Sequence, residues 1–192
     1  MNENGLAQAR ETAGQFAAKT IDALYSSDLK RAWQTAIEIA KVTDNHIFKD
    51  QRLREMHFGV FQNLPIERVK NDYFCEFDMY RNGDPDFVIP QGESRRQKYD
   101  RVVSFIGDIL ARHENQRIII VTHGGVLYDF FMFAFRIPLD LSFRLDHKNC
   151  SISCFFVENQ VWTLSRWGDT CHLGNGRSRV DEESAEKLIE SE

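Results

Sequence analysis

Several features that mark other classes of protein are scarce or absent in this chain. Its 24 Lys and Arg residues are outnumbered by 29 Asp and Glu residues, and the net charge of −5 disfavours a surface for nucleic acid or an anionic membrane. No apolar run is long enough to span a bilayer, and no signal peptide is visible. These absences predict a cytoplasmic protein without nucleic-acid or membrane partners.

Cysteine is also scarce, with Cys75, Cys150, Cys154 and Cys171 showing no paired framework. A chain of this size does not need disulfides, so we expect free thiols in a reducing compartment. Cys150 and Cys154 fall in an expected strand, where four residues span roughly 13 Å, too far for both to ligate one zinc ion. We therefore predict no metal and no cofactor.

The length of 192 residues fits one domain, which we place at residues 1–173, followed by a polar, charged tail at 174–192. Apolar periodicity predicts helices near the N-terminus, after residues 26–28, after residue 94 and over 126–135, the last apolar almost all round. The first three expected strands alternate with these helices, at residues 23–25, 46–49 and 118–121, and two more follow the last helix, at 151–157 and 161–166. This order predicts a three-layer α/β/α sandwich with a mostly parallel central sheet and a late antiparallel hairpin.

The most informative segment is Thr122-His123-Gly124-Gly125, which follows the branched apolar run at 118–121 and opens a helical pattern. Such a run is typical of a buried parallel strand. His123 would therefore lie at the carboxyl end of a sheet, where α/β folds bind ligands, beside a helix N-terminus suited to an anion. A structural histidine in a tight turn is the alternative interpretation.

Two other segments offer partners for His123. Arg31 lies in the first turn of an expected helix that follows a strand, where a guanidinium adds to the positive end of the helix dipole. Glu55 lies between apolar neighbours, where a carboxyl group can stay protonated and act as a general acid. Taken singly, a solvated arginine and an exposed glutamate remain open alternatives.

Together these segments resemble the histidine phosphatase superfamily, which includes phosphoglycerate mutases and small-molecule phosphatases. The resemblance runs through residues 4–9, 26–36, 53–59, 90–94, 122–125 and 167–173. It implies a phosphoglycerate mutase-like fold in which Arg31 and Gly124 bind the phosphoryl group, Glu55 donates a proton and His123 stabilises the phosphoryl oxygens. The implied partner is a small phosphorylated metabolite, and a homodimer is left open.

The family's nucleophile is a different histidine, which forms a phosphohistidine and belongs to an Arg-His-Gly motif after the first strand. None of the six histidines in this chain follows an arginine and precedes a glycine, so the motif and its strand are absent. A start chosen too far downstream, a phosphate-binding pseudoenzyme and a deliberate deletion are three explanations. We expect the first, because deletion of a central strand leaves unpaired backbone groups, and we expect this chain to be inactive as it stands.

The chain departs from its relatives at residues 60–63, beside the proposed acid. Residues 64–89 contain aromatic side chains that suit either an apolar lid or core packing, and they lack the arginine-rich patch of glycolytic mutases. We therefore expect a phosphomonoesterase rather than a mutase-type phosphotransferase. A serine hydrolase is disfavoured, because the chain has no Gly-x-Ser-x-Gly motif.

Overall fold

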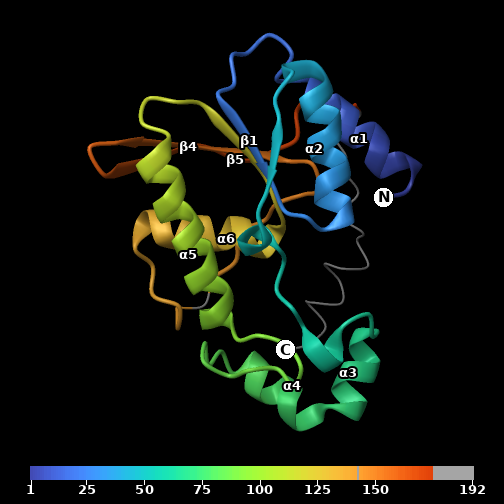
Figure 1. Ribbon diagram of the computed structural model, residues 1–192. Helices are drawn as coiled ribbons and strands as arrows, with labels where there is room; N and C mark the ends of the chain where they lie inside the picture. Colours follow the sequence, from blue (N-terminus) through green and yellow to red (C-terminus); the bar gives the residue numbers. More distant parts are fainter. Residues whose placement is uncertain (142, 175–192) are drawn as a thin grey trace.

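The computed structural model describes residues 1–141 and 143–174 (Figure 1). The elements are α1 (Glu3–Gly14), β1 (Ala23–Ser26), α2 (Lys30–Thr43), β2 (Ile47–Lys49), η1 (Gln51–Leu53), η2 (Gly59–Phe61), α3 (Ile66–Asp72), α4 (Phe74–Arg81), α5 (Arg95–Arg112), β3 (Ile118–Val121), α6 (Gly124–Phe135), β4 (Ile152–Glu158) and β5 (Val161–Asp169). The expected tail lies outside the described residues, apart from Gly174.

The parallel sheet has the strand order β2-β1-β3 within the described residues, with β1 in the centre. Leu24 of β1 lies opposite Ile47 on one side and Ile119 on the other. All four β1 residues are buried because strands cover both of its edges and helices cover both of its faces. The predicted parallel sheet is confirmed, and β1 and β3 end side by side.

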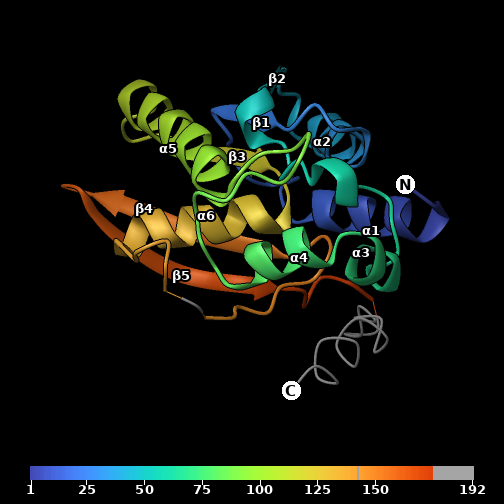
Figure 2. The same cartoon turned by 90° about the horizontal axis from the view of Figure 1, so that it is seen from below.

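Helices lie on both faces of this sheet (Figure 2). Leu24 and Ile119 point toward α1 and α2, where they pack with Ala13 and Ile39. On the other face, Ala23 and Tyr25 share a core cluster with side chains of α5 and α6. Successive strand residues point to opposite faces, so each strand contributes to both cores. The predicted three-layer arrangement is confirmed.

Strands β4 and β5 form the predicted antiparallel hairpin as a separate two-stranded sheet. Phe155 and Trp162 of this hairpin pack edge to face, and Trp162 also meets Phe133 of α6. The hairpin thereby extends the α5–α6 core beyond the parallel sheet. The placement of Cys150 in a strand was wrong, since β4 begins at Ile152 and Cys150 adopts a positive φ. The four cysteines, all within the described part of the chain, are free.

Two helix predictions need correction. We expected α2 to begin at Ser26–Asp28, but it begins at Lys30 without a side-chain cap. The hydroxyl and carboxylate expected to cap it are held by groups across the site, as described below. The second correction is smaller: α6 packs in the core, as its apolar pattern indicated, but Phe135 at its end is 42% exposed.

Helices α3 and α4 carry a third apolar cluster below the sheet (Figure 1). Tyr73, Phe77 and Tyr80 pack edge to face against Phe61 of η2, while Phe74 is 68% exposed. Core packing therefore accounts for most of the aromatics in residues 64–89. Among the described helices, none has both the length and the apolar character needed to cross a membrane.

Phe105 of α5 is fully buried between the parallel sheet and α6. We predict that Phe105→Ala lowers the free energy of unfolding by about 3–5 kcal/mol, because it leaves a cavity that close-packed neighbours cannot fill. Leu110→Ala, on the same helix but 41% exposed, should cost less than about 1 kcal/mol. Denaturant unfolding followed by circular dichroism measures both values, and equal losses would contradict this description of the core.

Candidate active site

The carboxyl ends of β1 and β3 bring Ser27, Arg31 and His123 together. Ser26 pairs with Val121 in register, so the residues that follow them emerge at the same edge of the sheet. His123 Nε2 lies 2.9 Å from Ser27 Oγ. Arg31 Nε donates to His123 Nδ1 over 3.1 Å. Arg31 and His123, two of the residues predicted to hold a phosphoryl group, are therefore in direct contact.

These contacts define the protonation state of His123. A guanidinium only donates hydrogen bonds, so Nδ1 must accept, and the neutral ring carries its proton on Nε2 and donates it to Ser27. Burial, followed by the charge of Arg31, lowers the His123 pKa to about 4. At neutral pH the imidazole is uncharged, although it lies beside a cation. An arriving dianion would offset both effects and favour the charged form.

Glu55 lies between η1 and η2, and its carboxylate is fixed by backbone groups. Oε1 accepts from Met56 N over 2.8 Å, and Oε2 accepts from Gly125 N over 3.0 Å. A Cβ on Gly125 would collide with this carboxylate, so any larger residue there would displace it. Each oxygen keeps a second lone pair that can carry a proton. The predicted acid is therefore attached to the same first turn of α6 that His123 opens.

Gly124 is the first residue of α6, with His123 as its N-cap. First-turn amides of a helix have no partner within the helix, and the dipole is positive at this end. Arg31 is exposed, and it forms no ion pair within residues 1–141 and 143–174. An anion at this position would meet a guanidinium, an imidazole and the helix N-terminus at once.

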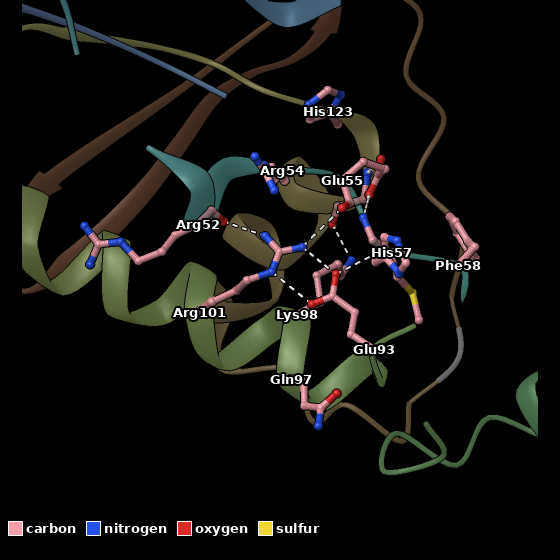
Figure 3. Close-up of polar contacts among 12 residues, drawn as sticks. Arg52, Arg54, Glu55, His57, Phe58, Glu93, Gln97, Lys98, Arg101 and His123 are labelled. Carbon is pink, nitrogen blue, oxygen red and sulfur yellow. Dashed lines mark hydrogen bonds and ion pairs between the residues drawn. The ribbon is translucent and has the colours of Figure 1, made fainter. Parts of the chain in front are cut away.

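Two ion pairs that we did not predict hold the segment around Glu55. Arg101 on α5 donates to the carbonyl oxygens of Arg52, over 2.6 Å, and Glu55, over 3.3 Å (Figure 3). It also pairs with Glu93 over 2.7 Å, and Glu93 accepts from His57 N over 2.9 Å. Burial raises the pKa of Glu93, but Arg101 and the His57 N–H outweigh it and lower the pKa overall.

The second pair joins Arg54 to Asp28, with Nε and Nη2 donating over 2.7 and 2.6 Å. The hydrogen bond from Arg54 lowers the pKa of Asp28. This pairing, together with the use of Ser27 by His123, explains why neither side chain caps α2. It also ties the β1–α2 loop to the segment that carries Glu55. The sequence offered Asp28 and Arg54 as motif residues, but their spacing did not indicate that they pair.

Comparisons with known proteins agree with this geometry. The family model for the histidine phosphatase superfamily (branch 1) matches residues 1–170. Phosphoserine phosphatase 1 of Hydrogenobacter thermophilus is 28% identical over 174 residues, covering 91% of this chain and 82% of that protein. Phosphoglycerate mutase-like protein 4 of Arabidopsis thaliana is 33% identical over 177 residues, covering 90% and 76%. The chain therefore belongs to the histidine phosphatase superfamily.

The solved structures give the same result. Bacillus stearothermophilus YhfR superposes with a TM-score of 0.81 at 27% identity, covering 90% of this chain and 86% of that one. The fold of this chain is therefore the α/β fold of histidine phosphatases.

The hydrogen bonds of His123 predict its titration. We expect its imidazole to be neutral at about pH 6, with a proton on Nε2 and a pKa near 4, since burial disfavours the charged ring. Proton-detected ¹⁵N spectra of the histidine rings distinguish the tautomers and give the pKa. Because burial is the larger cause, Arg31→Met should raise the pKa of His123 only part of the way toward the ordinary histidine value. Titration of His123 in the wild-type protein at or above pH 6.5, the ordinary histidine value, would contradict this account.

Proposed function

We propose that the complete domain, with a nucleophilic strand that these 192 residues do not include, hydrolyses small phosphomonoesters through a phosphohistidine. The observation that carries the proposal is the arrangement of Arg31, His123 and Glu55 around the N-terminus of α6. A phosphoryl group needs donors for its equatorial oxygens and a proton for the leaving oxygen. Arg31, His123 and the first-turn N–H groups of α6 supply the donors, and Glu55, held beside them by Gly125, would supply the proton.

In this mechanism, Arg31, His123 and the first-turn amide of Gly124 bind the phosphoryl oxygens. They neutralise charge that grows in the transition state. The nucleophilic nitrogen forms a bond to phosphorus as the ester P–O bond breaks, and Glu55 gives its proton to the departing oxygen. In the second step Glu55 takes a proton from the water that attacks phosphorus, which releases phosphate and restores the imidazole.

We propose that the nucleophile is carried by a strand that is not among these 192 residues. Two of the histidines present are held by structural contacts: His113 Nε2 lies 2.8 Å from Tyr25 Oη, and His172 Nε2 lies 3.0 Å from Thr12 Oγ1. Within the described residues, β3 pairs only with β1 and β4 only with β5. A strand added along the free edge of β3, parallel to it, would end beside His123.

The first test is binding without turnover. We predict that the 192-residue chain binds inorganic phosphate but does not hydrolyse p-nitrophenyl phosphate, because the pocket is present and the nucleophile is not. Isothermal titration and release of p-nitrophenolate measure the two properties, with Arg31→Met as the variant expected to lose binding. Robust turnover by this chain that His123→Ala abolishes would refute the proposed nucleophile.

Extension of the chain with the residues encoded immediately upstream tests the missing strand directly. We expect an in-frame Arg-His-Gly there, and the extended protein should gain turnover. Absence of that motif would contradict the proposed strand. A phosphate-binding protein without catalysis would then fit the chain better.

A third prediction concerns the leaving group in the extended protein. Glu55→Gln should lower kcat/KM, which reports the step in which the leaving group departs, by about 10²–10⁴-fold for an alkyl phosphate, because an alkoxide needs a proton to depart. The loss should be smaller for p-nitrophenyl phosphate, whose phenolate is a good leaving group. Glu67→Gln, an exposed change on α3, serves as the control. Equal losses for both substrates would show that Glu55 is not the general acid.

A further inference from the structure

The end of β5 has no part in the mechanism above, yet it holds a loop against the site. Trp167 Nε1 donates to the carbonyl oxygen of Asp146 over 2.8 Å. Gly168 adopts φ +60°, and its N–H donates to Ser153 Oγ over 3.0 Å. A Cβ on Gly168 would lie 3.2 Å from the Asp146 oxygen. A side chain at this position would therefore crowd the loop, and glycine also suits the left-handed backbone.

The loop held in this way places His147 on the first turn of α6. A Cβ built on Gly124 would overlap His147 Nε2, so the ring packs directly against the glycine next to His123. The imidazole is exposed to solvent. A residue from the long α6–β4 connection thus reaches the helix N-terminus where the phosphoryl group is proposed to bind. Substitution of Gly124 by any other residue would exclude His147 from this position.

The orientation of the ring suits an anion. Nδ1 of His147 faces the carbonyl oxygen of Leu145 at 3.4 Å, and a carbonyl only accepts, so Nδ1 carries the proton. Nε2 is then the nitrogen that faces α6. Both ring nitrogens donate in the imidazolium form, in which Nε2 would donate to a phosphoryl oxygen while Nδ1 donates to Leu145.

We propose that His147 is a further phosphate-binding residue, delivered to the site by the loop that Trp167 and Gly168 anchor. This inference rests on the proposed function, because it concerns the same phosphoryl pocket. His147 would contact a phosphoryl oxygen on the solvent side of Gly124, whereas Arg31 and His123 contact the group from the strand ends. The pocket would then hold two imidazoles of different origin, one buried and one exposed.

Ring ¹⁵N spectra of the 192-residue chain during titration with inorganic phosphate test the contact. We expect the ring ¹⁵N signals of His147 to shift as phosphate is added, together with those of the His123 ring. His46 packs against Phe48 on β2 and should not respond. Shifts of His123 without any response of His147 would overturn this inference and leave the proposed function standing. No response of either ring would count against the phosphate pocket itself.

Variants provide the second measurement. His147→Ala should weaken phosphate binding about tenfold, the value of one hydrogen bond to a charged group. His147→Gln, which keeps a polar side chain of similar reach, should recover part of this loss. His46→Ala controls for the loss of an imidazole far from the site, and Lys148→Ala controls for the loss of a charge from the same loop. Both variants should bind phosphate like the wild type. An unchanged dissociation constant in His147→Ala, or an equal loss in Lys148→Ala, would contradict a direct role.

Discussion

The hydrogen bond from Arg31 to His123 links the two halves of the candidate site, and the parallel pairing of β1 with β3 makes it possible. Each residue follows the carboxyl end of one strand, so the in-register pairing of Ser26 with Val121 fixes their separation. The bond also determines the chemistry of His123. Because Nδ1 accepts from a guanidinium and the ring is buried, the imidazole stays neutral beside a cation. The positive charge of Arg31 therefore favours an anion at this position.

The rest of the site is built outward from the turn that His123 opens. Gly125 in that turn donates to Glu55, so a hydrogen bond to α6 holds the proposed acid beside the proposed phosphate ligands. Arg101 fixes the segment that carries Glu55 from the side of α5, with Glu93 balancing its charge in a partly buried position. The proposed catalytic side chains thus depend on helices and strands for their positions, and small errors in placement are costly in catalysis.

The sequence predicted the parts of this arrangement that depend on local patterns. A branched apolar run indicated β3, and the rule that ligands bind at the carboxyl ends of parallel strands indicated His123. Local patterns also indicated Arg31 and Glu55, and the family resemblance favoured functional roles for them over a solvated arginine and an exposed glutamate. The sequence did not predict the Arg101–Glu93 and Arg54–Asp28 pairs, because partners of charged side chains are chosen by tertiary contacts. For the same reason the start of α2 was misplaced. His147 lies in a loop without periodicity, so no pattern indicated that it reaches Gly124.

The most direct test of the central claim is a crystal structure of the protein with orthovanadate, which mimics a phosphoryl group in transfer. The account predicts vanadate at the N-terminus of α6, with oxygens bonded to Arg31, His123 and the Gly124 amide, and with Glu55 beside one apical oxygen. Vanadate bound elsewhere, or a site in which Arg31 and His123 contact each other but no oxygen of the ligand, would contradict it.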